Sequence, residues 1–190
     1  MPFSEVHVGD LNPEFCEAAK TRLGVLNATA FAYAGSAEVV ARKVVTKLNP
    51  DGLHFAFLDP FNLGTLSFEI MKILSALKYI DLLVHVSVLD MQRNSDRYTD
   101  EEYEQFDVFA PGWRSAVSLD QNLESIRRDI FSYWWGLVRS LGFLDKRNAE
   151  LIRGTRSQRL YWLVFVSRHK IANYFWDQIV SPQKKFDFGG

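Results

Sequence analysis

Cysteine is almost absent from this sequence of 190 residues, which contains Cys16 and no other. A single cysteine cannot close a disulfide within the chain, and such sparing use is typical of a reducing compartment. We predict that Cys16 is a small packing residue on a helix rather than a nucleophile. Long apolar runs are absent too, since none approaches the roughly 18 residues of a membrane helix. The amino terminus MPFSEVHVGD carries charges where a signal peptide needs an apolar core. These absences predict a soluble cytoplasmic protein.

An excess of one charge sign is also lacking, because 22 Lys and Arg residues balance 23 Asp and Glu residues. Global electrostatics therefore gives no argument for nucleic acid, although a local basic patch stays compatible with this balance. The four histidines have no ligand partner at the spacings that metal sites use, so we predict packed structural histidines and no metal. The nucleophile-elbow, P-loop and kinase motifs are missing as well, which removes the basis for a hydrolase or kinase hypothesis.

What the sequence does contain is an alternation of strand-like and helix-like segments. Residues 53–58 and 80–89 form nearly continuous apolar runs, which is typical of strands buried on both faces. Asn12 and Ser36 stand where helices need their amino-terminal caps. This alternation predicts an α/β fold with a mainly parallel, Rossmann-like sheet and helices on both faces, within one domain of residues 1–190. The expected strands are 3–8, 28–33, 53–58, 80–89 and 160–166.

The regular alternation breaks after residue 92. Residues 93–119 are polar and predict a helical and irregular insertion, with a short acidic helix in YTDEEYEQF (98–106). Ser118 and Gln121 have the spacing of a capping box for a long helix carrying apolar residues from Leu123 to Leu141. A last helix is expected after residue 167, with Ile171, Phe175 and Ile179 facing inward.

The strongest functional signal is Asp59-Pro60-Phe61-Asn62, which follows the strand 53–58 at once. Ligands of open α/β sheets bind at the carboxyl ends of strands. Enzymes that methylate base amino groups use a related arrangement, an acidic or amide residue followed by two prolines and an aromatic, against a flipped base. We therefore take Asp59, Pro60 and Phe61 as catalytic candidates, with Asp59 orienting or deprotonating a substrate group and Phe61 stacking on it. The alternative is a helix-capping Asp59 and a core Phe61.

A second group of candidates predicts a nucleotide or cofactor site. Asp10 closes the first strand, where an acidic residue accepts hydrogen bonds from ribose hydroxyls in nucleotide-binding folds. Leu11 beside it and Ser36 after the second strand complete this set. The alternative is that Asp10 or Asn12 caps the next helix and that Gly35-Ser36 is a turn and a cap. The segment RGTRSQR (153–159) is a candidate phosphate-contacting loop.

The order of these motifs resembles the three-Cys-motif partner family, whose members are bacterial and phage-associated proteins with a methyltransferase-like Rossmann fold. The resemblance implies a class I S-adenosylmethionine-dependent methyltransferase, with Asp10 near the cofactor ribose and Asp59-Pro60-Phe61 beside the transferred methyl group. It implies S-adenosylmethionine as cofactor and a nucleobase or related nitrogen as acceptor. The resembling segments, which span nearly the whole chain, are VHVGDLNPEF (6–15), FAFLDPFNLGTLSFEIM (55–71), IDLLVHVSV (80–88) and VFVSRHKIANYFWDQI (164–179).

The chain departs from the family's pattern at its start. A strand and a glycine-rich turn of the F-A-G-x-G kind normally precede the segment 3–10, and this turn lets the backbone approach the methionine part of the cofactor. The missing strand would lie between the strand ending at Asp10 and the one ending at Asp59, so two inner edges would expose unpaired backbone groups. The chain is then a truncated piece, or its sheet closes up differently, or another polypeptide or a second copy supplies the strand.

Two functional hypotheses follow from the sequence. In the first, the protein transfers a methyl group by direct displacement, with Asp59 orienting the acceptor nitrogen, and nucleic acid is its partner. In the second, it is a catalytically inactive partner subunit that retains the fold and acts through protein–protein contacts, at the 93–119 insertion or at the unpaired sheet edge.

Overall fold

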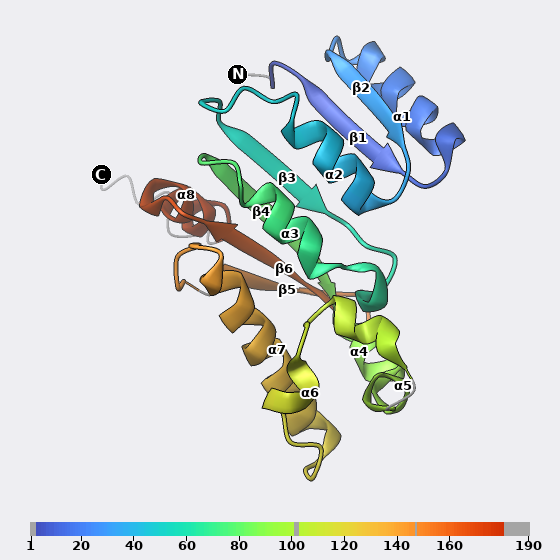
Figure 1. Cartoon of the computed structure of the whole chain (residues 1–190), viewed down its shortest axis with the longest axis vertical. Helices are drawn as coiled ribbons and strands as arrows, with labels where there is room; N and C mark the ends of the chain where they lie inside the picture. Colours follow the sequence, from blue (N-terminus) through green and yellow to red (C-terminus); the bar gives the residue numbers. More distant parts are fainter. Residues whose placement is uncertain (1–2, 101–102, 147, 181–190) are drawn as a thin grey trace.

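The computed structural model describes residues 3–100, 103–146 and 148–180, which form an α/β protein (Figure 1). The strands are β1 (Val6–Asp10), β2 (Ala30–Ala34), β3 (His54–Leu58), β4 (Ile80–Ser87), β5 (Asn148–Arg153) and β6 (Arg159–Ser167). The α-helices are α1 (Pro13–Val25), α2 (Ala37–Val45), α3 (Phe68–Leu74), α4 (Val88–Arg93), α5 (Ser95–Thr99), α6 (Trp113–Ala116), α7 (Leu123–Ser140) and α8 (Lys170–Val180). Two 3-10 turns are η1 (Leu63–Thr65) and η2 (Glu104–Val108).

The strands form two separate sheets, so the predicted mainly parallel, Rossmann-like sheet is wrong. β1 and β2 make a two-stranded parallel sheet, and the other sheet has the order β3-β4-β6-β5. In this second sheet β3 and β4 are parallel, whereas β6 is antiparallel to both β4 and β5. The physical reason is β5, a strand that the sequence pattern did not predict. It is joined to β6 by a tight turn in which Gly154 donates to the Gln158 carbonyl, and such a turn reverses the strand direction.

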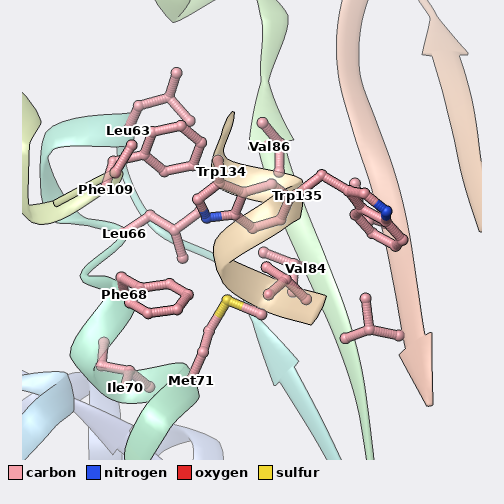
Figure 2. Packing of buried hydrophobic residues seen from close by; sticks show 14 of the residues in the cluster. Leu63, Leu66, Phe68, Ile70, Met71, Val84, Val86, Phe109, Trp134 and Trp135 are labelled. Atoms are coloured by element: carbon pink, nitrogen blue, oxygen red, sulfur yellow. The ribbon is translucent and has the colours of Figure 1, made fainter. Parts of the chain in front are cut away.

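The main core lies between the four-stranded sheet and the helices α3 and α7 (Figure 2). Figure 2 shows the fully buried Trp134 of α7 at its centre, with Leu66 and Phe109 on one side and Val84 and Val86 of β4 on the other. The rings of Trp134 and Phe109 stack with their centroids 5.3 Å apart. Aromatic side chains bury large areas and dominate core energetics, so this cluster anchors the carboxyl-terminal two thirds of the chain.

The predicted insertion contributes to this core rather than lying loosely on it. Phe106, Phe109 and Trp113 are fully buried. Arg114 fixes the segment, because it bonds to the carbonyls of Asp100 and Tyr103 at 2.9 and 3.1 Å. The acidic helix predicted over 98–106 includes residues 101–102, which lie outside the described residues; on either side the chain forms α5 and η2.

Two helix details differ from the sequence prediction. Asn122 caps α7 by accepting a hydrogen bond from the Ser125 amide, so the predicted Ser118–Gln121 capping box is wrong. In α8 the predicted inward face is exposed. The helix instead buries Asn173 and stacks Trp176 on Phe165 of β6 at 5.1 Å. The residues that the prediction placed inside are 56% to 68% exposed in the structure; they are Ile171, Phe175 and Ile179.

Helix α2 connects the two sheets. Its Val40 lies on Gly9 of β1, while its Ala41 belongs to the main core. Arg42 forms an ion pair with Glu69 of α3 at 2.9 Å, and Ser67 donates a hydrogen bond of 2.5 Å to Glu38. Figure 1 shows α2 lying across the space between β1 and β3. The position of the two-stranded sheet therefore depends on the contacts of one nine-residue helix.

The contact between Gly9 and Val40 gives a test of this role. A Cβ atom at position 9 would lie 2.6 Å from Val40 Cγ1, so Gly9→Ala has to push α2 away from β1. We expect the free energy of unfolding to fall by about 1–3 kcal/mol, as overpacked cores show. Gly24→Ala is the matched control: position 24 is a helical residue with open space around it, and we expect stabilisation by about 0.5–1 kcal/mol. Equal stability of Gly9→Ala and wild type in urea unfolding would contradict this packing.

Candidate functional site at the carboxyl ends of the strands

The candidate site is built on the last residues of β3 and β4. These strands are parallel and pair Leu58 with Val84, so Asp59 and His85 follow as neighbours. Asp59 Oδ1 lies 2.7 Å from His85 Nδ1, with the carboxylate side chain 61% exposed and the imidazole 21% exposed. A carboxylate accepts hydrogen bonds, so Nδ1 carries the proton of this bond. In the neutral imidazole the lone pair is then on Nε2, where it can accept a proton from a ligand.

Tyr161 of β6 fixes the imidazole from a second strand. The antiparallel register places Tyr161 opposite Ser87 at the end of β4. Its ring meets the edge of His85 at a centroid distance of 4.2 Å and an interplanar angle of 71°. Edge-to-face pairs of this kind are favourable and directional. The ring of His85 is therefore held by Asp59 on one side and Tyr161 on the other.

The loop after Asp59 is tied down at its far end, which leaves Phe61 at its tip. Asn62 caps η1 through reciprocal hydrogen bonds with Thr65. The Leu63 amide donates to Asp90 Oδ2 at 2.9 Å, and the Tyr98 hydroxyl donates to the same oxygen. Asp59 is therefore not the capping residue, and Phe61, which is 95% exposed, is not a core residue. Pro60 is half-buried between them.

The second group of predicted residues also comes together, at the ends of β1 and β2. The Gly35 amide donates to the Asp10 carbonyl at 2.9 Å, which brings Ser36 close to Asp10. Asp10 Oδ1 accepts a hydrogen bond from the Asn12 amide at 2.7 Å. Asn12 caps α1 and Ser36 caps α2, as the alternative interpretation of these residues expected. Leu11 is 76% exposed at the same edge.

The residues at this edge do not fit the whole of S-adenosylmethionine. The hydrogen bond to the Asn12 amide uses only Oδ1 of Asp10, so the other carboxylate oxygen suits a ribose hydroxyl. A methionine moiety needs backbone that a Cβ would otherwise block, as glycine-rich turns provide. Gly9 offers no such space, because Val40 fills it, and Gly35 has Val39 and Val40 at ordinary contact distances of 3.8 and 3.9 Å. Among the described residues at this edge, one carboxylate oxygen is thus compatible with a ribose hydroxyl, and no open glycine is available for a methionine moiety.

The segment RGTRSQR forms the hairpin between β5 and β6. Because Tyr161 pairs with Ser87 at the carboxyl end of β4, the hairpin turn lies beyond that end of the sheet, on the side of Asp59 and His85. Its three arginines, Arg153, Arg156 and Arg159, are exposed. Arg153 donates to the Ser157 carbonyl at 3.1 Å, which shapes the turn. The hairpin therefore presents positive charge at the same end of the sheet as the candidate site.

Other features of the described residues add no further candidate. They hold no group of three or more metal-ligating side chains. A hollow of about 570 Å³ is lined mainly by residues of α2, α3, η2 and α7, and it includes none of the predicted site residues. No helix within the described ranges has the length and apolarity needed to cross a membrane.

Comparisons of the chain with protein-family models, with curated proteins and with solved structures found no match. The resemblance to the three-Cys-motif partner family, and the activity that it implies, therefore stay predictions.

Sequence analysis missed His85 and Tyr161. His85 stands within an apolar strand, where a packed structural histidine is the usual interpretation, and Tyr161 comes from the distant β6. The signal that was present is the register of the two apolar strands, since aligning their ends places His85 beside Asp59. No local pattern in the sequence aligns Tyr161 with them.

The Asp59–His85 bond predicts the tautomer of the histidine. In the neutral form of the imidazole, we expect nitrogen NMR to show His85 protonated at Nδ1. Asp59→Ala should shift the population toward the Nε2-protonated form, because Nδ1 loses its acceptor. His54 is the internal control: its Nε2 lies 2.8 Å from the Asn49 carbonyl, so it stays protonated at Nε2 in both proteins. An Nε2-protonated His85 in the wild type would contradict the hydrogen bond from Nδ1 to Asp59.

The anchoring of the loop by Asp90 predicts a pH dependence. Burial raises the pKa of Tyr98 above its ordinary value near 10, and the hydrogen bond and charge of Asp90 raise it further. Tyr98 therefore contributes stability that is complete below about pH 10 and declines above it, as the unfolded chain ionises first. We expect the free energy of unfolding to fall more steeply from about pH 9.5 to 11 in wild type than in Tyr98→Phe, by at most about 1.4 kcal/mol per pH unit. Parallel curves for the two proteins would show that Tyr98 titrates normally.

Proposed function

We propose that this protein is methyltransferase-like and binds the nitrogen of a nucleobase, or of a related planar compound, at Asp59, His85 and Phe61. The observation that carries the proposal is the 2.7 Å hydrogen bond between Asp59 and His85, which leaves Nε2 of an oriented imidazole available as a proton acceptor.

Each of the three residues has a distinct role in this proposal. Phe61 offers an exposed ring on which a planar base stacks, an interaction that contributes about 1–3 kcal/mol per base. His85 accepts a proton from the acceptor nitrogen through Nε2. Asp59 orients the imidazole and stabilises the imidazolium that forms. The exposed arginines of the β5–β6 hairpin lie at the same end of the sheet as Asp59 and His85. Their positive charges suit the phosphates of a nucleic acid.

S-adenosylmethionine is the methyl donor that this proposal implies. The described residues fit its ribose end at Asp10 and not its methionine end, so the proposal assigns this chain the binding of the acceptor and the handling of its proton.

Ligand titration followed by NMR tests the acceptor site directly. We expect adenosine, cytidine or short single-stranded oligonucleotides to shift the ring signals of Phe61 and His85 together. Phe61→Ala should weaken binding about 5- to 100-fold, which corresponds to the loss of one stacked base. His54→Gln is the control, because His54 bonds to the Asn49 carbonyl within its own turn and should leave binding unchanged. Absence of any shift at Phe61 and His85 with all of these ligands would overturn the site.

A second candidate function, the catalytically inactive partner subunit, is favoured by a separate observation. β1 pairs only with β2 and β3 pairs only with β4, so each sheet ends in a strand with one free edge within the described residues. Such edges are sites for pairing with another chain. Calorimetric titration with S-adenosylmethionine separates the candidates, because an enzyme has to bind its cofactor and a partner subunit need not.

A further inference from the structure

The free edges of β1 and β3 carry backbone groups that point toward each other's sheet. The Val6 amide bonds to the carbonyl of Thr29, just before β2, and the His54 amide bonds to the carbonyl of Tyr79, just before β4. Backbone groups alternate sides along a strand with a period of two residues. The amides and carbonyls of His7 and Gly9 therefore face away from β2, and those of Phe55 and Phe57 face away from β4.

Side chains next to these edges are largely apolar, with His7 of β1 and His54 of β3 as the polar exceptions. On the face covered by α2, Gly9 lies under Val40, and Ala56 and Leu58 pack against the main core. On the opposite face, Phe55 and Phe57 are 47% and 53% exposed. Helix α8 does not shield them; its Trp176 stacks on Phe165, two strands away from β3. Two neighbouring half-exposed phenylalanines beside an unpaired edge are an unfavourable arrangement for an isolated chain.

Helix α2 lies across the space between the two edges (Figure 1). β1 and β3 run in the same direction (Figure 1). Helix α2 reaches both sides through adjacent residues, Val40 on β1 and Ala41 in the main core. A helix is about 10 Å wide, which is about twice the spacing of roughly 4.8 Å between paired strands. A gap of one helix width would therefore place an inserted strand within pairing distance of both edges.

We propose that the gap between β1 and β3 binds an extended apolar segment of another polypeptide, which joins the two sheets into one. The segment runs parallel to both strands and is apolar on both faces, because apolar side chains line the gap above and below. A second copy of this chain is not the occupant, since every strand in the described ranges is already paired and one would have to leave its sheet.

This inference deepens the second candidate function, and it also bears on the first. Residues 55, 57 and 59 alternate onto one face of the chain, so Asp59 and its bonded His85 lie on the face that Phe55 and Phe57 leave open. The inserted segment would consequently end beside Asp10 and Asp59, where the methionine end of a cofactor site is lacking. The inference stands on strand pairing alone, so a failure of acceptor binding at Phe61 leaves it unaffected.

A synthetic peptide tests the gap. The probe has five alternating valine and isoleucine residues flanked by two lysines at each end, and carries a fluorophore; the control peptide has proline at its centre. We expect fluorescence anisotropy to show saturable binding of the probe to the full chain, at least tenfold tighter than that of the proline peptide, since proline removes a ladder hydrogen bond.

Two variants at one position distinguish backbone pairing with the probe from nonspecific hydrophobic binding of the probe. Phe57→Ala keeps the amide that faces the gap, whereas Phe57→Pro removes it without breaking the bonds to β4. We expect Phe57→Pro to bind the probe at least tenfold more weakly than Phe57→Ala, with both variants retaining the wild-type circular dichroism. The absence of probe binding, or equal binding by the two variants, would overturn the inference. A concentration-dependent dimer that excludes the probe would equally overturn it, by showing that a second copy fills the gap.

Discussion

The structure depends on the packing of α2 across two sheets that do not pair with each other. Val40 on Gly9 and Ala41 in the main core lie side by side on one helix, and the Arg42–Glu69 ion pair links α2 to α3. Hydrogen bonding between strands normally carries this kind of connection, and here it is missing between β1 and β3. The two-stranded sheet consequently relies on α2 for its described contact with the rest of the fold.

The candidate site residues lie on both sides of this gap. Asp10 and Ser36 lie at one edge of it and Asp59 with His85 at the other, all at the carboxyl ends of strands. Tyr161 fixes the His85 ring, and Asn62 and Asp90 fix the loop after Asp59. At the other edge, Asp10 has one carboxylate oxygen outside its turn, and Val40 fills the space over Gly9.

The sequence predicted those features of the fold that depend on a few neighbouring residues, such as strands and helix caps. The strands predicted at 53–58 and 80–89 and the caps at Asn12 and Ser36 are confirmed, because strand propensity and capping act over a few residues. The predicted burial of the first of these strands on both faces is wrong, since Phe55 and Phe57 of β3 are 47% and 53% exposed. β5 was missed because NAELIR lacks a continuous apolar run, and its pairing with β6 made the sheet mixed. The inward face of α8 was assigned wrongly because its most apolar stripe is not the one that meets β6. The partnership of Asp59 with His85 is a matter of strand register, which a single segment does not encode.

Amide hydrogen exchange on the isolated protein tests the central claim most directly. If β1 and β3 are unpaired on their facing edges, the amides of Gly9, Phe55 and Phe57 exchange much faster than those of Ala56 in the same strand and of Val84 and Val164 in the core. Alternating protection of this kind along β3 is the predicted result. Uniform protection of Phe55, Ala56 and Phe57 would mean that the two sheets are joined in solution, and it would contradict the account.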